Sequence, residues 1–167
     1  MNRTHKLFTV VLGILFSLSA CNYSTAPQDS APTYSSSLSG GNIVPMPIRS
    51  SAIGNATISL NRESRSLSYE IKVDNNSGYV TTLICCGSAD ENGKPSVSLG
   101  DAMTTNRDQR GDCWDLTMEG SVEECFFDGD LTGKTLEDFQ MMVESGQMYV
   151  NIITTKYPDG ELRGQLR

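Results

Sequence analysis

The sequence contains almost no histidine: His5 is the only one among 167 residues. It lies in an N-terminal segment that we expect to be removed, so the mature chain would have none. A chain without histidine cannot form a Ser-His-Asp triad, a Cys-His dyad or a histidine-based zinc or copper site. Basic side chains are also scarce, with 13 Lys and Arg against 20 Asp and Glu and a formal net charge of −7. This balance argues against nucleic acid as a partner. We therefore expect a protein that is not an enzyme and that carries no cofactor.

Long apolar runs are absent except for residues 7–18, which are too few to span a bilayer as a mature helix. This run follows Arg3 and Lys6 and ends in Leu18-Ser19-Ala20-Cys21. A basic start, an apolar run and small residues before a cysteine are typical of a bacterial lipoprotein signal peptide. The alternative is an ordinary signal peptide that is cleaved near Ala20. We predict that residues 1–20 are the signal peptide and that Cys21 is acylated, because the cysteine directly follows the small residues. Several acyl chains on one cysteine would give stable anchoring.

This interpretation places an exported protein in the cell envelope, with the membrane as a partner through the N-terminal lipid. Asn22 rather than Asp follows the cysteine, which favours the outer membrane in bacteria that have one. Removal of residues 1–20 leaves 11 basic and 20 acidic side chains, a formal charge of −9. Residues 21–37 are rich in Ser, Thr and Pro and predict a flexible tether. Residues 38–167 then form one domain of ordinary size.

The domain has the pattern of an all-β fold. Alternating apolar residues or short apolar runs predict strands at 55–61, 66–73, 79–86, 96–99, 122–127, 148–155 and 161–166. The strand at 148–155 is apolar on both faces, so we expect it to be central and covered on both sides. Tyr157-Pro158-Asp159-Gly160 predicts a type I turn between the last two strands. Together these elements predict an antiparallel Greek-key β-sandwich or flattened barrel.

One short helix is also predicted. Thr135 can cap its N-terminus, with Asp138 placed to complete a capping box. Leu136, Phe139 and Val143 then recur at helical spacing, and Gly146 ends the helix.

The last strand alternates, with Leu162, Gly164 and Leu166 predicted inward and Glu161, Arg163 and Gln165 outward. Glu161 and Arg163 are expected to form a solvated surface ion pair. The motif Gly160-Glu161-Leu162-Arg163-Gly164-Gln165-Leu166, together with Tyr149-Val150-Asn151, resembles the closing signature of the CHRD domain, a module named after chordin. Leu38-Ser39-Gly40, Val44-Pro45 and Gly54-Asn55-Ala56 resemble its opening signature.

The resemblance implies the same β architecture and covers residues 38–167. The family pattern usually places histidines at three positions, two in the strand near Val80 to Gly87 and one in the penultimate strand. Here those positions hold Ile84, Cys86 and Ile153. A metal-binding role is therefore not carried over from the family.

Four cysteines follow Cys21, namely Cys85, Cys86, Cys113 and Cys125. Because the expected compartment is oxidising and the number is even, we predict two disulfides. Neighbours in a strand point to opposite faces, so Cys85 and Cys86 would each bond to one of the other two. The alternatives are a four-thiolate zinc or copper site and a vicinal Cys85–Cys86 disulfide that acts as a redox switch.

Acidic side chains in two loops offer a weaker prediction of a calcium site, namely Asp90, Glu91, Asp128 and Asp130. They do not form a complete EF-hand pattern, and solvated turns explain them equally well. The sequence as a whole predicts a lipid-anchored envelope protein with a non-catalytic domain that binds an unknown protein or envelope component. A metal-binding or redox function of the cysteines is the alternative.

Overall fold

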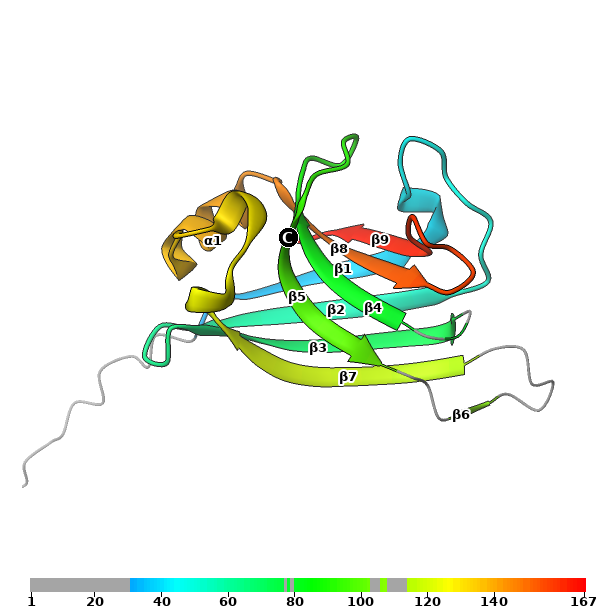
Figure 1. The fold of residues 1–167 in the computed structure, drawn as a ribbon, viewed down its shortest axis with the longest axis horizontal. Helices are drawn as coiled ribbons and strands as arrows, with labels where there is room; N and C mark the ends of the chain where they lie inside the picture. The colour runs from blue at the N-terminus through cyan, green and yellow to red at the C-terminus, as the bar shows by residue number, and fades with distance from the viewer. Residues whose placement is uncertain (1–30, 77, 79, 103–105, 108–113) are drawn as a thin grey trace, which may run out of the picture.

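A computed structural model of the chain describes residues 31–76, 78, 80–102, 106–107 and 114–167. The predicted signal peptide, Cys21 and Cys113 lie outside these residues. Nine strands form one antiparallel sheet in the order β5-β4-β8-β9-β1-β2-β3-β7-β6. Apart from the two-residue β6, the strands curve into a nearly closed barrel with one short helix (Figure 1), which confirms the predicted all-β class.

The elements have the following bounds: β1 Thr33–Ser39, η1 Gly40–Asn42, β2 Ile53–Asn61, β3 Ser66–Asn76, β4 Val80–Cys86, β5 Pro95–Ala102, β6 Asn106–Arg107, β7 Trp114–Glu123, η2 Glu124–Phe126, η3 Gly129–Leu131, α1 Leu136–Glu144, β8 Met148–Thr154 and β9 Leu162–Gln165. In Figure 1, strands β1, β2, β3 and β7 form the lower wall, and β4, β5, β8 and β9 form the upper wall. No helix among these described elements is long and apolar enough to cross a membrane.

The core lies between the two walls, because each strand turns its alternate apolar side chains inward. Fully buried members include Ile58, Ile71, Ile84 and Ile152, with Phe139 of α1 beside them. Strand β8 lies between β4 and β9 in the sheet. This confirms its predicted central position, with Met148, Val150 and Ile152 facing the core and Tyr149 buried on the outer face.

The barrel is open between β5 and β7, which are not paired by backbone hydrogen bonds. A side chain bridges this seam: the Tyr69 hydroxyl on β3 donates to the carbonyl oxygen of Leu99 on β5, at 2.5 Å. Tyr69 lies opposite Gly120 of β7, and a Cβ at Gly120 would lie 2.5 Å from the Tyr69 hydroxyl oxygen. The ring can therefore take this position only because residue 120 has no side chain.

The helix prediction is confirmed at its start. The Thr135 side chain accepts from the Asp138 backbone amide, and the Asp138 carboxylate accepts from the Thr135 amide, which completes the capping box. The hydrogen bond from the Thr135 amide lowers the pKa of the Asp138 carboxyl. The helix buries Leu136, Phe139 and Val143. Residue Gly146 follows it with φ of 72°, a conformation that suits glycine.

Two boundaries differ from the predictions. Residues 33–37, predicted to belong to the tether, form most of β1, so the described domain begins at Thr33. The predicted strand at 122–127 is wrong in its position: β7 covers Trp114–Glu123 and the chain then turns into η2.

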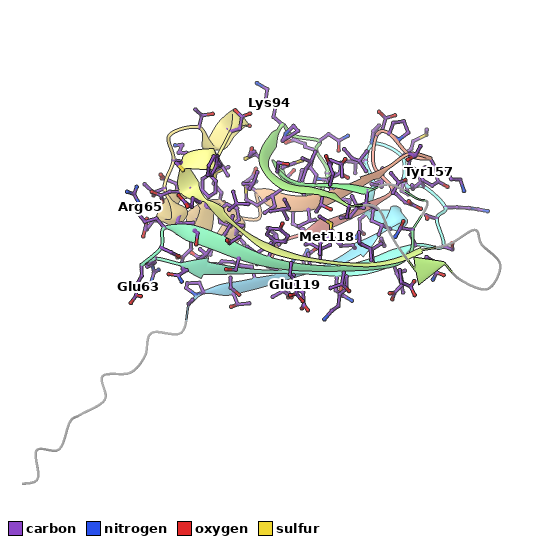
Figure 2. All side chains as sticks on the ribbon, turned by 60° about the horizontal axis from the view of Figure 1, so that its bottom comes forward. Glu63, Arg65, Lys94, Met118, Glu119 and Tyr157 are labelled. Atoms are coloured by element: carbon purple, nitrogen blue, oxygen red, sulfur yellow. The ribbon has the colours of Figure 1, made fainter. Side chains whose placement is uncertain are left out.

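The first residues of the domain lie at the end of the barrel that carries α1. The Leu60 amide donates to the Pro32 carbonyl, and the Tyr34 hydroxyl donates to Glu144 of α1. Glu63 and Arg65 mark the β2–β3 turn at this end, and Tyr157 lies at the opposite end (Figure 2).

Candidate functional site

Three loops meet over the outer face of the barrel. Two of them lie at the end opposite α1, and the third leaves β4 where Cys86 pairs with Met148 and reaches over β9 to meet them (Figure 1). They are residues 43–52 after η1, residues 87–94 between β4 and β5, and residues 155–161 between β8 and β9. We call this region the loop end. Two cavities lie there, on either side of the chain at 43–45, with volumes of about 740 Å³ and about 550 Å³. Both fall in the usual size range of ligand sites.

The side chain that organises the loop end is Arg163, in the middle of β9. It is 2% exposed, although it lies on the outer face of the barrel. Its guanidinium donates to the carbonyl oxygens of Ser88 at 2.6 Å and Glu91 at 2.7 Å, and to Asn92 Oδ1 at 3.3 Å. Burial lowers the pKa of the guanidinium, and the nearby Tyr149, Cys85 and Asp90 oppose that effect. The planar fork of donors thus fixes the loop at residues 87–94.

Tyr149 lies beneath Arg163 and completes this arrangement. The guanidinium carbon is 3.8 Å from the centre of the Tyr149 ring, a cation–π contact. The Tyr149 hydroxyl accepts from the Gly93 amide at 3.1 Å and donates to the Gly93 carbonyl oxygen at 3.4 Å. One aromatic side chain therefore contacts both Arg163 and the loop that Arg163 holds.

The other outward side chains of the closing motif hold further segments. Gln165 Nε2 donates to the carbonyl oxygens of Gly87 at 3.0 Å and Gly146 at 2.8 Å. Glu161 Oε1 accepts from the Ser50 hydroxyl at 2.6 Å. Glu161 is 0% exposed, so the predicted solvated ion pair with Arg163 is wrong. Both residues lie on the predicted face, but loops rather than water cover that face.

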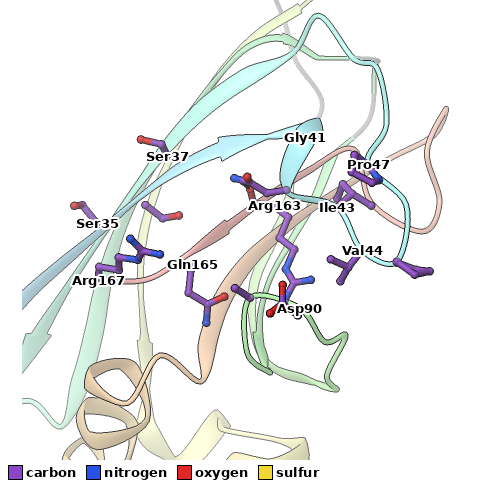
Figure 3. A pocket seen from close by; sticks show the side chains of 14 residues that line it. Ser35, Ser37, Gly41, Ile43, Val44, Pro47, Asp90, Arg163, Gln165 and Arg167 are labelled. Atoms are coloured by element: carbon purple, nitrogen blue, oxygen red, sulfur yellow. Dashed lines mark hydrogen bonds between the residues drawn. The ribbon is translucent and has the colours of Figure 1, made fainter.

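The larger space, which we call the arginine cavity, lies over β1 and β9 (Figure 3). Its lining includes Ser37, Asp90, Arg163, Gln165 and Arg167. Gln165 Oε1 is buried and has no hydrogen-bond partner among the described residues. The cavity is thus polar, and it carries charged groups of both signs.

The smaller space, which we call the tyrosine cavity, lies over the outer face of β4 and β8. Its floor contains Leu83, Cys85, Tyr149, Asn151 and Ile153. The three loops of the loop end form its walls, with Met46, Gly93, Pro95, Tyr157 and Pro158 among the lining residues. Apolar side chains make up most of this lining, so the two cavities differ in chemistry.

The cysteine predictions need correction. Cys85, Cys86 and Cys125 are free thiols, so the structure contains no disulfide among the described residues. Cys86 faces the core, with its sulfur 3.1 Å from Ser96 Oγ and 3.4 Å from Met148 Sδ. Cys85 faces outward into the tyrosine cavity, and Cys125 is exposed on η2. Because Cys85 and Cys86 point to opposite faces, they form neither the vicinal disulfide nor two ligands of one metal ion.

Burial raises the pKa of the Cys85 thiol to about 11 and also raises the pKa of Cys86. Burial likewise raises the pKa of the Tyr149 hydroxyl. These groups are protonated at neutral pH, so none of them supplies a thiolate nucleophile or a general base there.

The calcium candidates do not come together. Asp90 and Glu91 lie in the loop between β4 and β5, whereas Asp128 accepts from the Gly129 amide at the start of η3. In the part of the chain that the structure describes, no three His, Cys, Asp or Glu side chains are grouped so that they could hold a metal ion.

The three positions at which the family pattern has histidine do not share one face. Ile84 and Cys86 point into the core, whereas Ile153 points outward into the tyrosine cavity. The sequence could not show this separation, because the faces depend on how β4 and β8 pair. Sequence reasoning also missed the role of Arg163, Gln165 and Tyr149 in holding the loops.

The CHRD domain family model matches residues 34–166 of the chain. The match begins at the second residue of β1 and ends one residue after β9, so it includes the whole barrel and the loop end. No curated protein and no solved structure matches the chain.

Proposed function

Because the chain belongs to the CHRD domain family, we propose that its barrel is a non-catalytic binding module of the cell envelope, held at a membrane by lipid on Cys21. The binding surface is the loop end. The observation that carries this proposal is the buried Arg163. Its guanidinium donates hydrogen bonds to two loop carbonyl oxygens and so holds the loop in place, rather than binding a substrate. Loops fixed on a rigid barrel are the usual site of recognition.

The position of the N-terminus of the domain supports the same binding surface. The domain begins beside α1, whereas residues 43–52 and 155–161 of the loop end lie at the other end of the barrel. Between Cys21 and Thr33 lie residues 22–32, and a coil of that length and composition spans roughly 20 Å. A lipid on Cys21 would then leave residues 43–52 and 155–161 facing away from the membrane, where a partner can reach them.

The anchor is tested by the intact mass of the protein purified from membranes. We expect the mass of acyl chains on Cys21 and loss of residues 1–20. The Cys21→Ser variant should be recovered without lipid and should not fractionate with membranes. Recovery of both proteins without any lipid mass would overturn the anchor.

The binding surface is tested by a photoreactive amino acid placed at one of two exposed methionine positions in the full chain. Met46 is 76% exposed at the loop end, and Met141 is 59% exposed on α1 at the opposite end. We expect one discrete crosslinked product in cells from position 46 and none from position 141. Equal products from both positions, or none from position 46, would contradict the assignment of the surface.

A further inference from the structure

We propose that the tyrosine cavity receives an apolar side chain from a polypeptide partner, and that Asn151 pairs with the peptide group beside that side chain. This inference rests on the proposed binding function and names the chemistry that the partner presents. Nothing in the family match assigns a ligand to this cavity.

The lining of the cavity suits an apolar side chain, and its volume leaves room for the peptide groups beside that side chain. The volume is about 550 Å³, and Leu83, Ile153 and the Tyr149 ring form an apolar floor. Residues from three separate loops line its walls. Insertion of an aromatic or branched side chain would remove apolar surface of both molecules from water, which is the largest source of binding energy at such anchors.

Asn151 is the polar group that is available in the floor. Its side-chain amide lies against Gly160, where an added Cβ would be 2.6 Å from Asn151 Oδ1. It makes no hydrogen bond to any described residue, whereas the neighbouring Arg163, Gln165 and Tyr149 all bond to loops. A carboxamide offers a donor and an acceptor side by side, as a peptide group does. Asn151 can therefore pair with a backbone amide without any charge.

The charges near the cavity favour an uncharged ligand. Lys156 and Asp159 both line it, so one charge of each sign is present. The Lys156 amine lies 5.2 Å from the centre of the Tyr157 ring, and the guanidinium of Arg163 already bonds to two carbonyl oxygens. Met46 also lines the cavity and is 76% exposed. Its flexible thioether can adapt to different side chains. Together these groups suit an apolar side chain with its neutral peptide group.

The test is a titration of the full chain with the peptide N-acetyl-Gly-Trp-Gly-amide, followed by NMR of ¹³C-labelled methionine methyl groups. Met46 reports on the cavity, and Met141 on α1, which is also exposed, is the internal control. We expect a saturable shift of the Met46 signal, with half-saturation at about 1 mM or below. The Met141 signal should not move. Absence of a saturable Met46 shift, or an equal Met141 shift, would overturn the proposal.

A matched pair of variants locates the site. Ile153→Trp fills the cavity floor and should weaken binding by about tenfold or more. Ile53→Trp makes the same change at a position that is 56% exposed and lines neither cavity, and it should bind as the unchanged chain does. Circular dichroism of both variants checks that they remain folded. Equal binding by the two variants would overturn the assignment of the cavity.

The peptide group is tested separately. Asn151→Leu should weaken the tryptophan peptide by about three- to tenfold and leave the affinity for 3-methylindole, which has no amide, unchanged. The corresponding alanine peptide should not bind detectably. If Asn151→Leu weakens 3-methylindole equally, the pairing with a peptide group is wrong. If the crosslink at position 46 forms but the peptide does not bind, the cavity proposal fails while the proposed binding function stands.

Discussion

Replacement of Arg163 by lysine should destabilise the domain far more than the same change at Arg167. Both arginines lie near the arginine cavity, but Arg163 is 2% exposed whereas Arg167 is exposed. Lysine keeps the positive charge at position 163 and loses the planar fork that reaches the carbonyl oxygens of Ser88 and Glu91 together. The pair of variants therefore separates geometry from charge.

The magnitude follows from the contacts. Loss of one of two charge-assisted hydrogen bonds costs about 1.5–3 kcal/mol. Loss of the stacked contact with Tyr149, at 3.8 Å, costs about 1 kcal/mol more. Lysine keeps a hydrogen bond to the other carbonyl oxygen, so we expect Arg163→Lys to lower the free energy of unfolding by about 2.5–4 kcal/mol. Arg167→Lys should change it by less than about 0.5 kcal/mol.

Urea unfolding followed by far-UV circular dichroism gives the free energies for both variants. A local assay adds cleavage by a protease specific for glutamate, because Glu91 lies in the loop that Arg163 holds. Cleavage after Glu91 in native protein should be faster in Arg163→Lys and unchanged in Arg167→Lys. If the two variants unfold within about 0.5 kcal/mol of each other, Arg163 does not hold the loop as argued.

Three further predictions concern other parts of the molecule. Tyr69→Phe removes the hydrogen bond to Leu99 across the open seam and should lower the free energy of unfolding, measured in urea, by about 1 kcal/mol. Gly120→Ala places a Cβ against the Tyr69 ring and should lower it by about 1–3 kcal/mol. A Gly120→Ala protein as stable as the original would show that the ring can move aside freely. Thr135→Ala removes the helix cap and should cost about 0.5–2 kcal/mol, whereas Thr135→Ser should restore most of it, and equal losses in both would contradict the capping role. Burial raises the pKa of the Cys85 thiol to about 11, so at pH 8 only about 0.1% of it is thiolate. N-ethylmaleimide should therefore label Cys85 at least about 100-fold more slowly in native protein than in urea. Similar labelling rates, measured by mass spectrometry, would refute the burial of Cys85.

Alternation in the sequence identified most strands, and the spacing of Thr135 and Asp138 identified the capping box. Both features depend on local patterns. Strand β1 was missed because its inward positions are not all apolar. Tyr34 and Leu38 face the core, but Ser36 lies between them, buried against Gly164 of β9. A glycine on the neighbouring strand leaves room for a small polar side chain, and this pairing cannot be read from β1 alone.

The first part of β7 was a different kind of error. Leu116 and Met118 are buried, and the residues between and beside them are exposed, which is ordinary period-two alternation. The signal was present in the sequence, but the segment is polar overall, and no strand was predicted there. The disulfide prediction failed for a tertiary reason. Alternation placed Cys85 and Cys86 on opposite faces, but it does not show that Cys86 faces the core beside Met148 or that Cys125 is exposed on η2.

The closing motif shows what alternation cannot determine. The pattern assigned Glu161, Arg163 and Gln165 to the outer face, and on an open barrel that face would meet water. Here the loops at 43–52 and 87–94 fold over it, and these polar side chains supply the hydrogen bonds that the backbone of the loops requires. A polar outer face on β9 is therefore the condition for ordered loops rather than a sign of exposure. Asn151, two residues along β8 from Tyr149 and opposite Arg163, belongs to the same face but bonds to none of the described loop groups. Arg163 and Gln165 bond to the loops, whereas the side chain of Asn151 does not. This difference is the reason to seek a ligand at Asn151.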